Sequence, residues 1–454
     1  MATAEKSRSA LWNPQRRTFT GGLILVITLV AFEAMGLGTA LPTIVAELDA
    51  QRWYSWPFTV FLAASAIGTV IGGRQSDRRG PALPLLLALP TFAVGLVIAA
   101  AAPNILVLLA ARVLQGLGGG VLIVALYVMI ARVYPEEHRP AAFGALSSAW
   151  VVPALVGPVI AGLLTEHASW RWVFLGLAPL VCIGTAMLIP TVRRFGARSG
   201  EPSPLRRGLP LAALGAAGGV VALSFAAQNL SWSSLVLGLV AIAVLVPSIR
   251  LLLPKGTLLA RSGLPVMVLA RGLLAGLFFT AQAFVPLTLS VVHHYSPTAA
   301  GVPLTVGSLG WTVGALWQSR QRKFRREYLV ATGSLLVGAG IAGLSLALPE
   351  WGPHWLVFAC WFVAGTGMGI GVASTAVRVL ALSAEHERGF NSAALQISDM
   401  LGQAALVGLG GVVVSALATP TAPTRGVVPL DLALLVGALL AAWLLIRAGR
   451  DQTS

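Results

Sequence analysis

Charged side chains are scarce in this sequence. They make up 10% of its 454 residues, whereas soluble globular domains contain about 25%. Acidic residues are the rarer kind, with 16 Asp and Glu against 31 Lys and Arg. Hydrophobic residues make up 56% of the chain, and the mean hydropathy is +0.83. This composition excludes an ordinary soluble protein.

Cysteine and the common catalytic motifs are also scarce or missing. The two cysteines, Cys182 and Cys360, lie in apolar segments, so no disulfide framework is expected. The sequence contains no P-loop, no HExxH, no GxSxG and no cluster of His and Cys. We therefore expect no ATP hydrolysis by this chain, no metal site and no catalytic site. A polytopic membrane enzyme is the least favoured class.

Long apolar runs dominate what is present. Runs of roughly 20 residues recur from about Thr20 to Leu445, and each is long enough to cross the hydrocarbon core of a bilayer. The alternating pattern of a membrane β-barrel is absent, so the spans should be helices. The sequence thus predicts an all-α polytopic membrane protein. Its fourteen transmembrane helices are expected at 20–46, 54–73, 82–102, 104–133, 141–165, 170–191, 209–228, 233–253, 264–291, 298–319, 328–348, 354–382, 390–418 and 428–447.

Basic residues recur in alternate loops, while the intervening loops contain only Arg52, Arg171 and Arg425. This bias predicts a multi-pass protein of the cell inner (cytoplasmic) membrane with both termini in the cytoplasm. The net charge of +15 is then a topology signal that suits anionic lipid headgroups, not nucleic acid. The first apolar run is too long for a signal-peptide core, so it is interpreted as a retained span.

The last six spans look like a copy of the first six. "TALPTIVAEL" at 39–48 aligns with "AFVPLTLSVV" at 283–292, "QGLGGG" at 115–120 with "AGTGMG" at 364–369, and "EEHR" at 136–139 with "EHER" at 385–388. Parallel repeats that bind substrate between them are one known transporter architecture. The expected parts are an N-terminal segment 1–19, a six-helix half 20–191, a cytoplasmic linker 192–208, two inserted helices 209–253, a second six-helix half 264–447 and a cytoplasmic tail 448–454.

Short motifs then point to a family. The loop after the second span, "GGRQSDRRGP", resembles the signature loop of the major facilitator superfamily, and the fourth span, "LAARVLQGLGGG", resembles the pattern of its antiporters. The first span, "FEAMGLGTALP", and the fifth resemble motifs of that superfamily's fourteen-span drug:proton antiporter (multidrug efflux) branch. The matching residues are Gly73, Asp77, Arg78 and Gly80 in the loop, Arg112, Gln115, Gly116 and Gly118 in the fourth span, Gly144, Gly157, Pro158 and Gly162 in the fifth, and Glu33 in the first. Pro153 and Ala161 replace two glycines of the fifth-span motif.

The resemblance implies a fold of two six-helix halves plus two inserted helices, and a function. The chain would export small lipophilic or cationic compounds such as drugs by alternating access. The proton gradient would be the energy source, with no cofactor, and we expect a monomer. A lipid or glycolipid exporter of the same fold is the alternative. The fifth span would be a bent helix with a tight glycine seam, and the loop after the second span would be a gate.

Three charged residues within spans are the candidates for proton coupling. Glu33 lies about 13 residues into the first span, where a charge costs roughly 2.5–3.5 kcal/mol, so it should face the protein interior. Burial favours the uncharged carboxyl, which would allow proton exchange; a carboxyl hydrogen-bonded to a neighbouring helix is the alternative. Arg112 would tune a carboxylate, as the family implies, or anchor helices. Asp399 would bind a second proton or a cationic substrate, or satisfy a polar contact.

Other polar residues have simpler explanations beside the functional one. Asp77 is expected in a cytoplasmic turn, where it would cap a helix and, in the family, form a charge latch. His293 and His294 are expected to be solvated, and several tryptophans, among them Trp56 and Trp170, to form an aromatic belt. The candidates for lining the substrate cavity, which hydrogen bonds between helices would explain equally well, are Gln115, Gln282, Asn391, Gln396 and Gln403.

Overall fold

The computed structural model describes residues 11–13, 16–195, 208–229, 231–321, 323–384 and 387–450. Within these ranges all regular elements are helices, apart from an isolated bridge between Thr419 and Ala422. Fourteen helices are long and apolar enough to cross a membrane, which confirms the predicted number and the all-α class. Residues 196–207 of the predicted linker 192–208 lie outside the described residues, as do much of the segment 1–19, part of the tail 448–454 and residues 385–386 of the second "EHER" copy.

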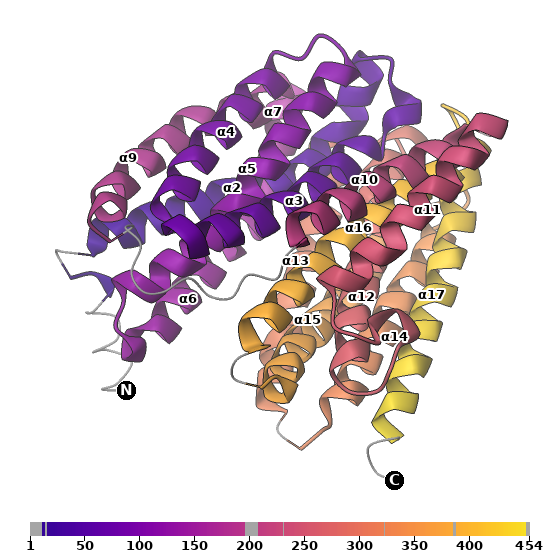
Figure 1. The fold of residues 1–454 in the computed structure, drawn as a ribbon. Coiled ribbons are helices and arrows are strands. Elements are labelled where there is room, and N and C mark those ends of the chain that lie inside the picture. The colour runs from indigo at the N-terminus through magenta and orange to yellow at the C-terminus, as the bar shows by residue number, and fades with distance from the viewer. Residues whose placement is uncertain are drawn as a thin grey trace. The chain divides into compact units, whose positions relative to one another are not determined.

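The helices follow the order predicted from hydropathy (Figure 1). The first group is α2 (Arg17–Glu47), η1 (Gln51–Trp53), α3 (Trp56–Arg79), α4 (Ala82–Ala100), α5 (Ile105–Val133), η2 (Glu136–His138), α6 (Arg139–Ser148), α7 (Val151–His167), α8 (Arg171–Leu175) and α9 (Leu177–Phe195). The inserted helices are α10 (Leu209–Gln228) and α11 (Trp232–Leu252). The last group is η3 (Thr257–Leu259), α12 (Leu264–Val292), α13 (Pro297–Arg320), α14 (Arg326–Ala347), α15 (Leu356–Leu382), α16 (Arg388–Leu417) and α17 (Thr424–Arg450).

Short polar side chains begin several of these helices. The side-chain oxygen of Asn104 accepts from the backbone N–H of Val107 at 3.1 Å, and that of Ser231 accepts from Ser234 at 3.1 Å. Each cap satisfies one of the backbone donors that the first turn of a helix leaves without a partner. The capped starts of α5 and α11 explain why the apolar runs become helical where they do.

Contacts divide the chain into two compact units. Unit 1 runs to Ala40 and then from Ala64 to Pro210; unit 2 contains Leu41–Ala63 and the chain from Leu211 onward. The boundary therefore cuts α2 and α3, and the tip of the hairpin that they form belongs to unit 2.

Within each unit one glycine-rich helix packs between two others. In unit 1, a Cβ on Gly120 of α5 would meet the backbone of Ser65 in α3, and one on Gly118 would meet Ala88 and Phe92 in α4. Small residues allow such close approach between membrane helices. The glycines of α5 thus allow close packing against both α3 and α4.

Unit 2 repeats this arrangement with α15. The glycines that the repeat aligns with Gly120 and Gly118 are Gly369 and Gly367. A Cβ on Gly369 would meet the backbone of Trp311 in α13, and one on Gly367 would meet Gly333 in α14. Aligned glycines therefore make equivalent contacts, which supports the internal repeat.

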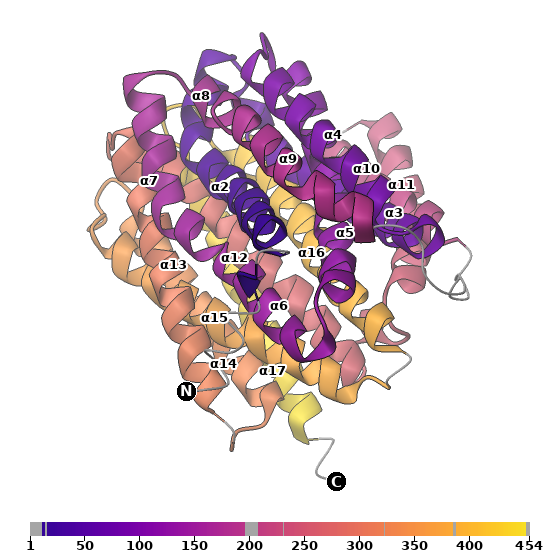
Figure 2. The ribbon, with the colours of Figure 1, turned by 90° about the vertical axis from the view of Figure 1, so that its left-hand side faces the viewer.

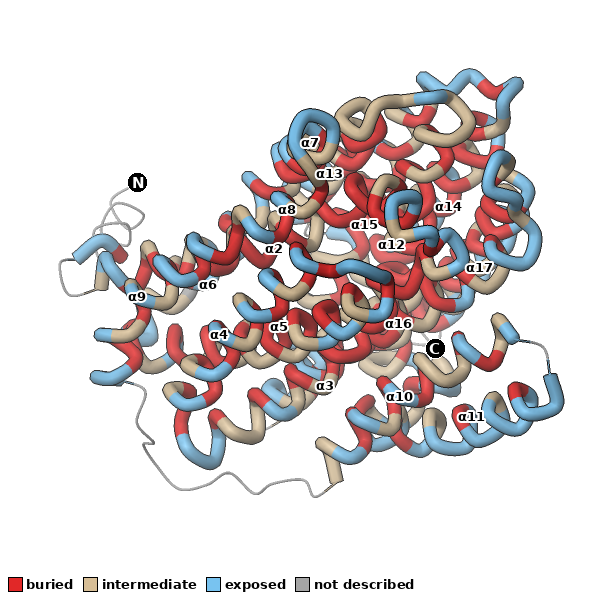
Figure 3. Tube along the Cα trace, turned by 90° about the horizontal axis from the view of Figure 1, so that it is seen from above, coloured by how far each residue is buried: buried red, intermediate tan, exposed pale blue. Residues whose placement is uncertain are grey.

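The inserted helices α10 and α11 pack along each other. A Cβ on Gly219 of α10 would meet Leu245 and the backbone of Ala241 in α11. Much of α11 is exposed, as the tube coloured by burial shows (Figure 3), and its side chains there are large and apolar, including Leu235, Leu239 and Ile242. Such a surface suits the hydrocarbon core of a bilayer.

Candidate functional site

Glu33 of α2 is completely buried in unit 1 and pairs with Arg112 of α5. Nη1 of Arg112 donates to Oε1 of Glu33, and also to Oε1 of Gln115 at 2.5 Å. Gln115 lies one turn beyond Arg112 on α5 and is buried as well. The three side chains, all predicted as site residues, therefore form one cluster.

The cluster leaves some hydrogen-bonding capacity unused. Oε2 of Glu33 and Nε2 of Gln115 are both buried and have no hydrogen-bond partner among the described residues. A buried carboxylate is tolerable only when it is paired, because leaving water costs a charge several kcal/mol. Arg112 supplies that pairing through one carboxylate oxygen, and the other oxygen can accept a proton.

A second ion pair lies in unit 2, between Asp399 of α16 and Arg271 of α12. Nη2 of Arg271 lies 2.8 Å from Oδ2 of Asp399, and its Nη1 donates to the carbonyl of Val372 at 3.2 Å. Gln403 donates to Oδ1 of Asp399 at 3.1 Å. Asp399 and Gln403 were predicted from the sequence, whereas Arg271 was not. The signal was available, because Arg271 is a charge inside an otherwise apolar run.

The repeat places an aromatic stack where unit 1 has its buried ion pair. The alignment of 115–120 with 364–369 pairs Arg112 with Trp361, and the alignment of 39–48 with 283–292 pairs Glu33 with Leu277, next to Phe278. The rings of Phe278 and Trp361 stack with centroids 4.8 Å apart. The two halves therefore differ at equivalent positions, and the acid of unit 2 sits on another helix.

Two further buried acids in unit 2 were not predicted. Glu327, at the start of α14, accepts from Nε of Arg378 of α15 at 2.7 Å. Asp431 of α17 is buried, and its Oδ2 has no partner among the described residues. Asp431 could have been found by the rule that identified Glu33, because it lies within the last apolar run.

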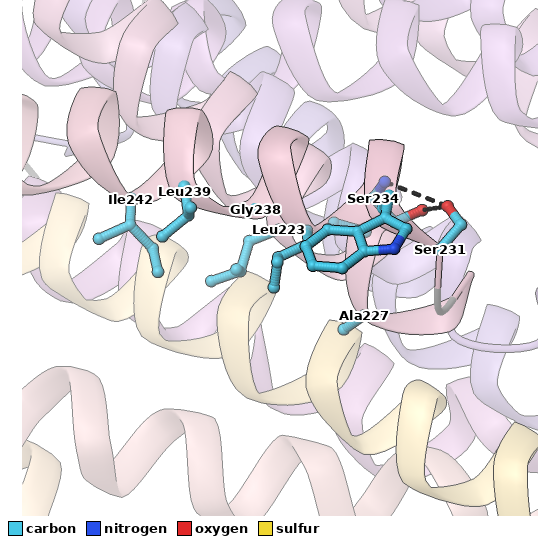
Figure 4. Close-up of a pocket in the computed structure, with 10 residues that line it drawn as sticks. Leu223, Ala227, Ser231, Ser234, Gly238, Leu239 and Ile242 are labelled. Carbon is cyan, nitrogen blue, oxygen red and sulfur yellow. Dashed lines mark hydrogen bonds between the residues drawn. The ribbon is translucent and has the colours of Figure 1, made fainter.

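An apolar cavity of about 650 Å³ lies between α10 and α11 in unit 2 (Figure 4). Its walls include Leu223, Ala227, Leu239 and Ile242, and Ser231 and Ser234 lie at one end. No titratable side chain is among its lining residues, and none of the predicted site residues lines it. The cavity therefore suits an apolar group and takes no part in the charged clusters.

Comparison with known proteins decides the family. The sequence-family model of the Major Facilitator Superfamily matches residues 23–317 of this chain. The chain belongs to this superfamily. It is therefore a membrane-spanning transporter rather than an enzyme, and the resemblance drawn from the motifs is confirmed.

Curated relatives and solved structures agree with this membership. A "probable multidrug-efflux transporter" of Mycobacterium tuberculosis is 26% identical over 449 residues, covering 91% of both chains. An "Acurin A biosynthesis cluster MFS-type transporter" of Aspergillus aculeatus is 28% identical over 369 residues, which cover 75% of this chain and 65% of that protein. Among structures, a peptide transporter POT in complex with sulfate has a TM-score of 0.70 at 16% identity, with 95% of both chains covered. A bacterial homologue of the human lysosomal transporter Spinster has a TM-score of 0.66 at 16% identity, covering 96% of this chain and 98% of that one.

The superfamily's signature loop differs from its expected local structure. Asp77 and Arg78 do not lie in a turn: α3 continues to Arg79, so both occupy its last turn, whereas Gly73 lies further inside the helix. The predicted cap is wrong too, because Pro81 precedes α4 and no side chain caps it. Only Gly80 makes the turn, with φ of +83°, a conformation that favours glycine.

The helix that carries the antiporter motif in the fifth span is interrupted at an unexpected place. The helix is interrupted at Ala149 and Trp150, between α6 and α7 (Figure 2), whereas Gly157 and Pro158 lie inside α7. Pro153 has no N–H to offer the carbonyl of Ala149, and the hydroxyl of Thr28 donates to that carbonyl instead, at 3.2 Å. The residue that departs from the motif thus accounts for the break.

Within unit 1 the motif glycines of the fifth span have different surroundings. Gly157 and Gly162 are buried in α7, and Gly157 faces Phe32 and Met35 of α2. Gly144 has open space where its Cβ would be, so it makes no close helix contact there. Ala161, which replaces a motif glycine, packs tightly against Gly36 of α2.

The remaining polar candidates have mixed outcomes. Asn391 is buried and donates to Oγ of Ser383 at 3.0 Å, which ties α16 to the end of α15. Gln282 and Gln396 are half-buried. His293 is half-buried, and its Nε2 lies 2.9 Å from the carbonyl oxygen of Leu348; His294 is exposed.

Two tryptophans also differ from the expected aromatic belt. Trp56 and Trp170 are both buried. Trp172, Trp351 and Trp355 are exposed, as tryptophans at an interface should be.

Proposed function

We propose that this transporter is a proton-coupled antiporter that exports small lipophilic or cationic compounds by alternating access. The observation that carries the proposal is the buried cluster of Glu33, Arg112 and Gln115. A titratable group inside a span is costly, and such groups mark ion and proton pathways in membrane proteins.

The cluster provides a partner for Arg112 in both protonation states of Glu33. When Glu33 is ionised, its charge compensates that of Arg112. When a proton binds Glu33, the attraction between the two side chains falls, and Oε1 of Gln115 still accepts from Arg112. Proton binding therefore changes the contact between α2 and α5, which couples the proton to helix movement. Asp399 and Arg271 form the second such pair.

The proposal also includes the energy source, the location and the substrate class. The proton gradient is the energy source and no cofactor is needed. The protein is a monomer of the cytoplasmic membrane with both termini in the cytoplasm, as the basic loops suggest. The substrate class is supported by the similarity to a probable multidrug-efflux transporter over 91% of this chain.

Transport by purified protein in vesicles tests the proposal. With an acidic lumen, native protein should accumulate a fluorescent lipophilic cation in exchange for protons. Glu33→Gln, which keeps a hydrogen-bonding side chain but cannot ionise, should lose this accumulation and keep exchange of the same cation without a gradient. Glu47→Gln is the matched control, since Glu47 is an exposed acid on the same helix.

Three results would overturn the proposal. Accumulation by native protein that ignores the pH gradient excludes proton antiport. A Glu33→Gln variant that responds to the gradient as native protein does excludes Glu33 as the coupling group. A requirement for ATP excludes secondary transport.

A further inference from the structure

The tip of the α2–α3 hairpin is held inside unit 2 by Tyr54. The tip is the segment Leu41–Ala63. The hydroxyl of Tyr54 donates to the carbonyl of Ala283 in α12 at 2.8 Å, and its ring stacks on Phe284 with centroids 5.4 Å apart. Tyr54 is buried, so this hydrogen bond is shielded from water. Helix α12 forms the first wall of the tip's site.

Helix α16 forms the second wall of the tip's site, and glycines of α16 lie against the tip. A Cβ on Gly411 would collide with the side chain of Ser55, and a Cβ on Gly408 would meet Ser224 and Thr59. Ser55 and Thr59 are both buried. The tip therefore fits closely against α16 only because these positions carry no side chain.

The third wall is α10, one of the two inserted helices. Nε1 of Trp56 donates to Oε1 of Gln228 at 3.0 Å, and the edge of Phe225 packs on the Trp56 ring with centroids 6.3 Å apart. Trp56 is buried, and a buried indole N–H without an acceptor is costly. The acceptor comes from a helix that the six-helix repeat does not contain.

Helix α10 uses its two faces differently. Leu223 and Ala227 line the cavity toward α11 (Figure 4), whereas Ser224 and Gln228 contact the tip and α16. Nε2 of Gln228 is buried and has no partner among the described residues. The buried amide of Gln228 is thus engaged by the hairpin tip through its oxygen alone.

We propose that α10 is a clamp that helps to hold the hairpin tip in unit 2, and that opening of the Trp56–Gln228 hydrogen bond favours release of the tip. The tip joins the parts of α2 and α3 that belong to unit 1. Any rearrangement that carries those helices away from unit 2 must therefore first detach the tip. The role of tip release in such a rearrangement rests on the proposed transport cycle. The clamp, which is the contact of α10 with the tip, does not.

Distance measurement between spin labels tests the clamp without any transport. The full chain, with Cys182 and Cys360 replaced by alanine, would carry labels at Gln51→Cys in the tip and Ser233→Cys at the start of α11, both exposed positions. Gln228→Leu keeps the volume and removes the acceptor. It should raise the ratio of long to short distances by about 2- to 10-fold, as loss of one hydrogen bond predicts.

Asn229→Ala is the matched control. Asn229 is the next residue and is exposed, and among the described residues its side chain donates only to the Phe225 carbonyl, at 3.0 Å. Distances in this variant should equal those of native protein. Unchanged distances in Gln228→Leu, or an equal shift in Asn229→Ala, would overturn the clamp.

A second variant decides the case if Gln228→Leu fails to fold. Trp56→Phe removes the donor and keeps an aromatic ring against Phe225. Trp56→Phe should by itself raise the ratio of long to short distances by about 2- to 10-fold. Where Gln228→Leu does fold, the double variant should add nothing further. A Trp56→Phe protein with native distances, or fully additive effects of the two changes, would contradict the proposal.

Discussion

At the scale of single residues, the Glu33–Arg112 and Asp399–Arg271 ion pairs differ in their access to water. The side chains of Arg112 and Glu33 are 1% and 0% exposed, whereas those of Arg271 and Asp399 are each 14% exposed. Removing one partner of a fully buried pair leaves a charge without compensation or solvent. The same removal costs less where water can reach the remaining charge.

The stability of two arginine variants should therefore differ. Arg112→Ala is expected to lower the free energy of unfolding by about 3–5 kcal/mol, and Arg271→Ala by clearly less. Thermal unfolding of the purified proteins in one detergent measures the order. The double variant Glu33→Leu/Arg112→Met should regain most of the loss, because apolar replacement of a whole buried pair is often neutral. Equal losses in the two single variants would contradict this ranking.

The members of the charged site could be predicted from the sequence where they are charged residues within apolar spans. Glu33 is costly inside a span and was singled out by its position there, and Arg112 was singled out by its match to the family's fourth-span motif. Their pairing depends on how α2 and α5 turn toward each other, which hydropathy does not determine. Asp431 and Arg271 obey the same rule and were overlooked, whereas the stack of Phe278 on Trp361 carries no signal beyond ordinary hydrophobicity.

At the scale of helices, hydropathy predicted all fourteen spans because each apolar run must satisfy its own backbone in lipid. The interruption at Ala149–Trp150 was not placed correctly, since it requires weighing Pro153 against Pro158. At Pro153 the carbonyl of Ala149 loses its helical donor, and the hydroxyl of Thr28 donates to it instead. Such partners come from other helices and are invisible in the local sequence.

Glycine positions give a test at this scale. A Cβ on Gly365 of α15 would lie against the backbone of Gly307 in α13, whereas one on Gly144 of α6 would meet nothing within 4 Å. Gly365→Ala should lower the free energy of unfolding by about 1–3 kcal/mol through overpacking. Gly144→Ala should be neutral or stabilising by up to about 1 kcal/mol, because alanine favours helix. Thermal unfolding of both proteins measures this. Unchanged stability of Gly365→Ala would mean that α15 and α13 do not pack closely at Gly365 and Gly307.

At the scale of the whole molecule, the repeat and the compact units do not coincide. The repeat divides the chain between residues 191 and 264, whereas the tip Leu41–Ala63 belongs to unit 2. Sequence similarity records how the halves arose, and contacts record which segments pack together. The inserted helices join the second group through Gln228 and Phe225. A segment of the first half thus depends on helices outside the repeat for its position.

Surface labelling tests both the number of spans and their direction. Three spanning helices, α11, α12 and α13, separate Ser233 from Lys323, so the two residues must lie on opposite sides of the membrane. In a background without Cys182 and Cys360, Ser233→Cys in intact cells should react with a membrane-impermeant maleimide. Lys323→Cys should react only after the cells are permeabilised, because basic loops favour the cytoplasmic side. Reaction of both from the same side would contradict the spans, and the reverse pattern would place both termini outside the cytoplasm.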